Sequence, residues 1–281
     1  MIPILAAGGD PDQLDIIGHL TDPYHLATPF GAVDLQASIN EPLKGLIGFD
    51  PHISVFVLMM WTASAILILT ATAAARWWAK AGPDAAPGGV RNLIEPVLLF
   101  VRDQLVYPQL GEKHGRRWTP FFWTVFFFIL TVNLVGLLPA PWGIAASGNV
   151  SVTVALALMT LFAIIVGGTV EKGALGFWAG LVPHGVPLYL WPLVFLIEVF
   201  GLLAKHLALT VRLFANMTAG HVIILALFSF IFLSKSFAIG VVSLGGVVAI
   251  TLFEIFVSFV QAYIFTTLSA IFIGAGLSHE H

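Results

Sequence analysis

Polar and ionisable side chains interrupt two long apolar stretches near the end of the sequence, residues 188–233 and 237–277, and six of them are candidates for chemistry. They include a cation, two carboxylic acids and an imidazole, which are groups that bind ions or exchange protons. A charge at the centre of a bilayer costs about 2.5–3.5 kcal/mol on insertion scales, so such side chains usually pair or line a water-filled path. The candidate ion-pathway residues are Glu198, Arg212, Asn216, His221, Glu254 and Gln261.

The spacing of these residues relates them to the faces of a helix. Glu198, Lys205 and Arg212 follow one another at seven-residue intervals, so on a helix they form one stripe that drifts by only about 40°. Asn216 lies one turn after Arg212 and close to the same face. His221 lies on the opposite side of an ideal helix.

Structural roles are open alternatives for most of these side chains. A salt bridge would explain Glu198 together with Lys205, and snorkelling or a turn would explain Lys205-His206. Hydrogen bonds between helices would explain Asn216 and Gln261, and His221 would be a packing residue. Arg212 is harder to explain, because its neighbours are mostly apolar and no carboxylate lies within one turn of it. We expect such an arginine to meet an acidic group of another chain.

The composition is that of an integral membrane protein. Of the 281 residues, 58% are hydrophobic and only 10% are charged, with a mean hydropathy of +0.96, whereas about a quarter of the residues in soluble domains are charged. A net charge of −3, with no basic run beyond Arg116-Arg117, gives no reason to expect a nucleic-acid partner. Cysteine is absent, which excludes disulfides and thiolate chemistry. No cofactor and no metal are expected.

Hydropathy divides the sequence into five segments. We predict an acidic N-terminal segment (1–52), a transmembrane helix (53–75), an amphipathic interfacial helix (90–117), a transmembrane hairpin (118–170) and a hairpin of long helices (188–277). Two of these segments contain three uncharged runs of 21 to 23 residues, 53–75, 118–138 and 150–170, each long enough for a hydrocarbon layer of about 30 Å. Charges interrupt the apolar residues of 90–117, which favours a helix at the membrane surface over a span.

The basic residues predict the orientation of the chain. Eight fall on one side of the predicted spans and two on the other, and the positive-inside rule makes the first side the inner one. The acidic segment 1–52 then lies outside, and because it lacks the basic start of a targeting segment we expect it to be retained. The Ala/Gly-rich composition and the Met1 start favour a bacterial cytoplasmic membrane over a mitochondrial inner membrane. The inner residues are Arg76, Lys80, Arg91, Arg102, Lys113, Arg116, Arg117 and Lys172, and the outer ones are Lys44 and Lys235.

Residues 188–233 and 237–277 are too long for ordinary spans. As continuous helices they would measure about 70 and 60 Å, roughly twice the hydrocarbon thickness. Each must fold back or cross at a steep slope, and average helix tilts near 20° favour folding back. The candidate breaks are Lys205-His206 and Gly245-Gly246, and neither is flanked by a turn signal. The sequence pattern therefore leaves both alternatives open.

The segment "LTVRLFANMTAGH" (209–221) closely resembles the signature of subunit a of F-type ATP synthase, in which an essential arginine is followed by Leu-Phe, a small residue and Asn-Met. The resemblance extends to "IEVFGLLAKH" (197–206), to "LFEIFVSFVQAYIFTTLSAIFI" (252–273) and weakly to "NLVGLLP" (133–139). It therefore covers most of the chain after residue 90, whereas the first fifty residues contain no recognisable motif.

This family is the stator of a rotary ion motor. The resemblance implies an all-α membrane fold whose two long helices slope steeply against a ring of c subunits, and it thus favours the sloping alternative. It also implies contacts with peripheral-stalk b subunits, other ATP synthase subunits and membrane lipid, with no nucleotide site on this chain. Arg212 matches the essential arginine and Asn216 the asparagine one turn on. Glu198 matches a family carboxylate, and Gln261 matches the glutamine of the last helix.

Four positions depart from the pattern of many bacterial members. Those members have glutamate at the position of His221 and histidine at the position of Glu254, whereas this sequence has the reverse order, as mitochondrial and related alphaproteobacterial members do. Gly136 replaces an aspartate, and His206 replaces a usual proline. Roles that depend on those last two family side chains do not transfer to this chain.

The resemblance implies proton translocation through two offset half-channels. A rotor carboxylate stays neutral while it faces lipid. At about 4 Å and an effective dielectric of ~20, Arg212 attracts the ionised form by about 4 kcal/mol. The arriving acid therefore loses its proton beside Arg212 and regains one from a separate path. We expect His221 and Glu254 to serve the outer path and Glu198 the inner one, with protons favoured over sodium.

The alternative function is a multi-spanning secondary transporter that binds a solute near the midplane of the membrane. The sequence shows no internal repeat and no broken Gly/Pro helix beside Arg212, which argues against this class. An intramembrane protease is disfavoured because the sequence contains neither a G-x-S-x-G nor an H-E-x-x-H motif.

Overall fold

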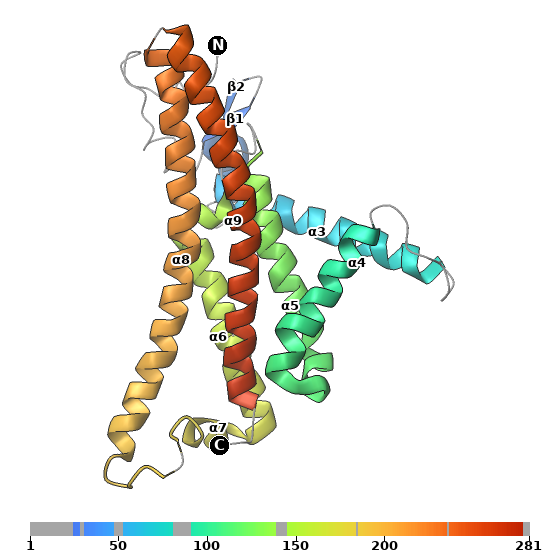
Figure 1. The fold of residues 1–281 in the computed structure, drawn as a ribbon, viewed down its shortest axis with the longest axis vertical. Coiled ribbons are helices and arrows are strands. Elements are labelled where there is room, and N and C mark those ends of the chain that lie inside the picture. The colour runs from blue at the N-terminus through green and yellow to red at the C-terminus, as the bar shows by residue number, and fades with distance from the viewer. Residues whose placement is uncertain are drawn as a thin grey trace. The chain divides into compact units, whose positions relative to one another are not determined.

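The computed structural model describes residues 25–28, 31–47, 53–80, 91–138, 145–183, 185–234 and 236–277. Long helices make up most of the ribbon (Figure 1), and the chain divides into two compact units. The first unit comprises Met1–Leu69, Ile129–Asn149 and Phe214–Phe259, and the second comprises Thr70–Phe128, Val150–Leu213 and Val260–His281.

Five helical stretches of the described chain are long and apolar enough to cross a membrane. A helix satisfies its own backbone hydrogen bonds, which lipid cannot do, so an apolar chain of this composition folds into helices. The predicted all-α membrane fold is confirmed, apart from a hairpin of two four-residue strands, β1 (His25–Thr28) and β2 (Gly31–Asp34). The candidate spans are Val55–Arg76, Ile94–Gly136, Val150–Lys172, Trp191–Ile231 and Phe237–Leu277.

The last two helices are uninterrupted. α8 (Trp191–Leu233) has 43 residues and α9 (Phe237–Leu277) has 41, which correspond to about 65 and 62 Å. The fold-back alternative is therefore wrong, since neither Lys205-His206 nor Gly245-Gly246 breaks its helix. Helices of this length fit a hydrocarbon layer of about 30 Å only if they slope steeply.

The N-terminal part of the first unit is tied to the first long helix, α3 (Val55–Lys80). After β2 the chain forms the π-helical segment η2 (Gln36–Asn40) and the short helix α2 (Glu41–Ile47). The buried Asn40 side chain donates to the Ile53 carbonyl at 3.1 Å and accepts from the Ile53 N–H at 2.9 Å. This two-way bond fixes the chain just before α3. Residues 1–24, 29–30 and 48–52 of the predicted outer segment lie outside the described residues.

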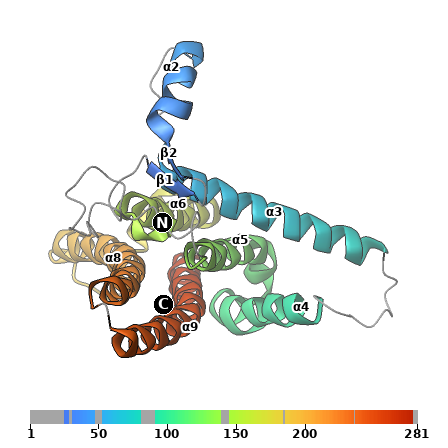
Figure 2. The ribbon, with the colours of Figure 1, turned by 90° about the horizontal axis from the view of Figure 1, so that it is seen from above.

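The region predicted as one amphipathic helix, 90–117, has three parts in the second unit. These are α4 (Arg91–Phe100), the π-helical η3 (Val101–Val106) and the first turns of α5 (Tyr107–Gly136). Gly111 interrupts α5 with a φ of 70°, which glycine adopts without strain. The Trp123 indole N–H donates to the Leu98 carbonyl at 2.9 Å and holds α4 alongside α5 (Figure 2). The location of this region at the membrane surface stays a prediction.

Close packing in the second unit depends on two adjacent glycines of α6 (Val150–Lys172). A Cβ atom built on Gly167 would lie 2.6 Å from the Trp118 ring, and one built on Gly168 would overlap the ring of Phe177 in α7 (Ala174–Ala179). Small residues at such positions allow apolar helices to approach closely in lipid. The two glycines therefore fix α5, α6 and α7 against one another.

Candidate functional site

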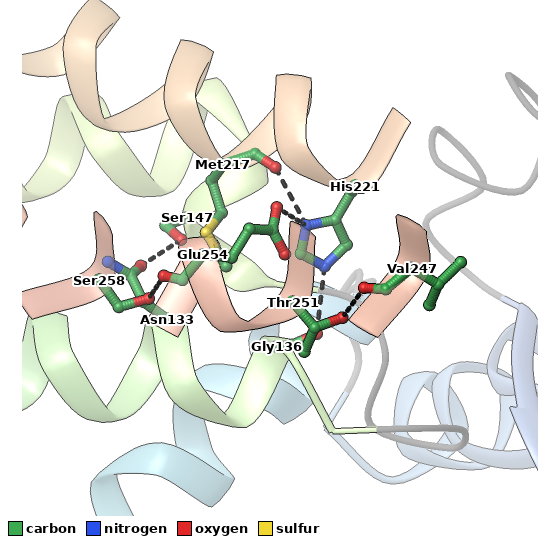
Figure 3. A network of polar contacts seen from close by, with 9 residues as sticks. All are labelled: Asn133, Gly136, Ser147, Met217, His221, Val247, Thr251, Glu254 and Ser258. Atoms are coloured by element: carbon green, nitrogen blue, oxygen red, sulfur yellow. Dashed lines mark hydrogen bonds and ion pairs between the residues drawn. The ribbon is translucent and has the colours of Figure 1, made fainter. Parts of the chain in front are cut away.

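A histidine and a glutamate meet in the first unit, one from each long helix (Figure 3). His221 Nδ1 in α8 lies 3.9 Å from Glu254 Oε1 in α9, and the two side chains are 11% and 6% exposed. Two side chains that serve one proton path must be neighbours, and the distance between His221 and Glu254 meets that requirement. A proton can pass between them directly after a small shift or through one water molecule.

Both ring nitrogens of His221 also face backbone carbonyl oxygens. Nδ1 lies 3.0 Å from the Met217 carbonyl and Nε2 lies 3.1 Å from the Gly136 carbonyl (Figure 3). A carbonyl only accepts hydrogen bonds, so a ring with two N–H groups satisfies both oxygens, whereas a ring with one N–H group satisfies one. Gain or loss of a proton at His221 therefore changes its hydrogen bonds to the backbone.

Two glycines create the space for this pair. A Cβ atom on Gly220 would overlap the Glu254 carboxylate, and a Cβ atom on Gly136 would overlap Ala145. Any side chain at Gly136 would therefore displace Ala145. At this position the chain contributes a backbone carbonyl to His221 in place of a carboxylate.

Further buried polar groups belong to the same unit. Ser147, in the 3-10 turn η4 (Ala146–Gly148), donates to Asn133 Oδ1 at 2.6 Å, and both side chains are buried. Ser258 donates to the Glu254 backbone carbonyl at 2.8 Å. Among the described residues, Asn133 Nδ2, Thr218 Oγ1 and both Glu254 carboxylate oxygens are buried without a hydrogen-bond partner. Buried polar groups of this kind are commonly satisfied by water.

The sequence reasoning missed Asn133 and Ser147 as members of this cluster. The available signal was an amide within the uncharged run 118–138. The Gly136 carbonyl gives no comparable signal, because a backbone oxygen looks the same at every position of a sequence.

Arg212 belongs to the second unit, where its side chain is exposed among apolar side chains that are also exposed, including Leu207 and Val211. No carboxylate of the described residues forms an ion pair with it. Its backbone carbonyl accepts a hydrogen bond of 3.3 Å from Nε2 of the buried Gln261 in α9. Gln261 thus anchors the backbone that presents the arginine.

A cavity of about 390 Å³ in the second unit contains the half-buried Glu198. Its walls include two cations, Lys172 and Lys205, and the ring of Phe272. Within the described chain no ion pair joins Glu198 to Lys205, and Lys205 Nζ lies instead 5.5 Å from the centre of the Phe272 ring. This arrangement argues against the salt-bridge explanation of Glu198.

The six predicted residues thus fall into separate groups. The structure brings His221 to Glu254 and Gln261 to the backbone of Arg212. Glu198 lines its cavity without a hydrogen bond to any of the other candidates, and the exposed Asn216 likewise has none.

The fold and the site together define a multi-pass helical membrane protein with ionisable side chains inside its spanning helices, the class that includes ion-translocating proteins. Residues 57–274 match the family model described as ATP synthase A chain. The chain is 41% identical over 272 residues to "ATP synthase subunit a" of Chloroherpeton thalassium, covering 96% of this chain and 79% of the relative. It is also 41% identical over 284 residues to "ATP synthase subunit a" of Myxococcus xanthus, covering 97% and 92%. The chain therefore belongs to the ATP synthase A chain family, which confirms the resemblance seen in the sequence.

Proposed function

We propose that this chain is the stator subunit of the membrane part of a proton-driven ATP synthase in a bacterial inner membrane. In this function it provides two offset proton half-channels beside a ring of c subunits, and peripheral-stalk b subunits hold it against rotation. Proton flow then drives rotation and ATP synthesis, while nucleotide chemistry belongs to other subunits. The observation that supports this function most strongly is Arg212, an exposed cation on an apolar helix face with no acidic partner among the described residues.

Arg212 acts in this proposal as a fixed positive charge. A guanidinium keeps its proton at any relevant pH, so the arginine attracts an ionised carboxylate of the ring and cannot carry the proton itself. The attraction of about 4 kcal/mol at 4 Å favours proton loss from the arriving acid. The same charge of Arg212 also prevents a neutral rotor carboxyl from passing between the half-channels without exchanging its proton. Gln261 supports this role by holding the Arg212 carbonyl.

His221 and Glu254 form the proposed outer half-channel. Their 3.9 Å separation, their burial and the carbonyl groups around the imidazole suit a pair that takes up a proton and passes it on. Both groups exchange protons readily, unlike Arg212. The buried polar cluster around Asn133 and Ser147 would extend this path with water.

Glu198 and its cavity form the proposed inner half-channel. A half-buried carboxylate that lines a cavity of about 390 Å³ suits proton release toward the inner side. Lys172 and Lys205 keep the cavity hydrated because their ammonium groups retain water. Asn216, one turn after Arg212, is assigned a supporting polar role beside the rotor.

The test replaces Arg212 in the complete synthase. We expect Arg212→Ala and Arg212→Lys to assemble normally and to lose proton-coupled ATP synthesis by about a thousandfold, the factor that corresponds to 4 kcal/mol. Lysine is expected to fail because it lacks the planar guanidinium and loses its proton when desolvated. The matched control is Leu196→Ala, which truncates an exposed side chain of the same helix. Normal coupling in either arginine variant would contradict the proposal, as would solute uptake by the isolated chain.

A further inference from the structure

His206 is a buried ionisable side chain that the proposed half-channels leave unused. It lies in α8 eight residues after Glu198 and six residues before Arg212, and only 4% of it is exposed. The family resemblance has a proline at this position, so nothing known of the family's pattern assigns a role to the imidazole. Neither of its predicted roles fits, because α8 makes no turn here and a buried side chain does not snorkel.

The hydrogen bond of His206 determines which nitrogen can accept a proton. Nδ1 lies 2.7 Å from the Leu202 carbonyl oxygen, and a carbonyl only accepts, so the neutral ring holds its proton on Nδ1. Nε2 then has a free lone pair. This nitrogen is buried and has no hydrogen-bond partner in the described part of the chain.

The ring lies directly behind the wall of the Glu198 cavity. It packs against Phe272 with 5.7 Å between ring centres, and its hydrogen-bond acceptor belongs to Leu202. Both residues line the cavity, as does the adjacent Lys205. The ring therefore contacts residues of the cavity wall, although it does not itself line the cavity.

The charged groups around this wall favour release of a proton once the ring has taken one up. Lys172 and Lys205 bring positive charge to the cavity, and Glu198 brings the one carboxylate among its lining residues. The part of α9 in this unit contributes no ionisable side chain except Tyr263. A positively charged imidazolium is thus repelled by Lys205, and Glu198 in the adjacent cavity can accept its proton.

We infer that His206 is a proton-carrying residue of the inner half-channel, located between the level of Arg212 and the Glu198 cavity. The inference rests on the proposed function. During synthesis Nε2 accepts a proton released by a rotor carboxylate, while the Nδ1–H bond to Leu202 stays in place. The new N–H bond then breaks toward water in the cavity or toward Glu198, and the electron pair returns to Nε2. ATP-driven pumping uses the same steps in reverse.

Conservative variants of His206 test this inference in the complete synthase, in inside-out membrane vesicles. His206→Gln keeps a group that donates to the Leu202 carbonyl, and His206→Leu keeps the apolar volume, but neither side chain can carry a proton. We expect both to bind normal amounts of the ATPase part and to lower passive proton conduction, measured after removal of that part, at least about tenfold. The control is His114→Gln, which removes another histidine of the same unit, one paired with Glu171 at 3.9 Å.

Chemical rescue separates proton transfer from packing. In His206→Ala, added imidazole should restore much of the proton conduction through the adjacent cavity, whereas pyrrole, a ring of the same size without a basic nitrogen, should not. Conduction of His206→Gln at the parent level would overturn the inference, and so would an assembled His206→Ala complex that imidazole does not rescue. Arg212→Ala is measured in parallel. If it retains coupling, the proposed function itself has failed. If it loses coupling while His206→Gln is unimpaired, only the role of His206 is wrong.

Discussion

The exchanged pair His221 and Glu254 allows a quantitative test of the outer half-channel. Opposite charges 3.9 Å apart attract by about 4 kcal/mol at an effective dielectric of ~20. That energy is lost when either partner is neutralised, and the remaining buried charge is then left without compensation. We therefore expect His221→Gln and Glu254→Gln each to lower proton conduction by at least tenfold and by up to about a thousandfold.

The reversed pair should behave better than either half of the exchange. His221→Glu alone places two carboxyl groups together, and Glu254→His alone places two imidazoles together. Each single change removes the attraction, and the two groups repel each other whenever both are charged. The double variant restores an opposite pair. Its recovery should stay incomplete, because the carbonyls of Met217 and Gly136 face residue 221, and a carboxylate there donates nothing to them.

The assay is passive proton conduction in vesicles after removal of the ATPase part, normalised to the amount of this chain in the membrane. We expect proton conduction to decrease in the order parent, double variant, Glu254→His and His221→Glu. The last variant is the poorest because its new carboxylate faces two acceptor carbonyls as well as Glu254. A double variant that conducts no better than the better of the two single variants would refute the shared pathway, although membership in the family would stand.

Two further predictions follow from the site. Glu198→Gln should slow proton release by roughly tenfold without abolishing it, because water and other polar groups of the cavity can still pass protons. A chain that fails to assemble would instead indicate a structural role. The control is Glu171→Gln, which removes a carboxylate of the same unit that does not line this cavity. Gly220→Ala should lower proton conduction as strongly as Glu254→Gln, because the added methyl group would occupy the position of the Glu254 carboxylate. The matched control is Gly240→Ala, where no neighbour lies within 4 Å of the added methyl group. Equal conduction in both glycine variants would show that the packing at Gly220 does not matter.

Much of the helical fold was predictable because it depends on composition along the chain. Uncharged runs indicated the spans, and backbone hydrogen bonding in lipid restricts such runs to helices. The continuity of α8 was not predictable from the pattern alone, since an apolar stretch of 43 residues is compatible with one sloping helix or two shorter ones. The family resemblance decided this point, and the uninterrupted helix at Lys205-His206 confirms it.

The site was predictable only where side-chain type was the signal. His221 and Glu254 stood out as ionisable residues in apolar surroundings, and their pairing followed from antiparallel neighbours. The carbonyl that faces His221 comes from Gly136, 85 residues earlier, and no periodicity relates the two positions. Burial of His206 was likewise hidden, because which face of a long apolar helix is covered depends on tertiary packing rather than on hydropathy.

The distribution of partners explains how one helix can hold charges with opposite tasks. His221 has Glu254 within hydrogen-bonding reach after a small shift, so a proton taken up there remains compensated inside the chain. Arg212 has no acidic partner among the described residues, and its side chain is exposed. A fixed charge that was paired internally would be neutral toward a rotor, whereas the carboxylate of Glu254 lowers the cost of charging the buried His221. Paired groups that exchange protons are thus separated from an unpaired group that is permanently charged. A stator needs this separation if protons are to reach the rotor but never pass the arginine.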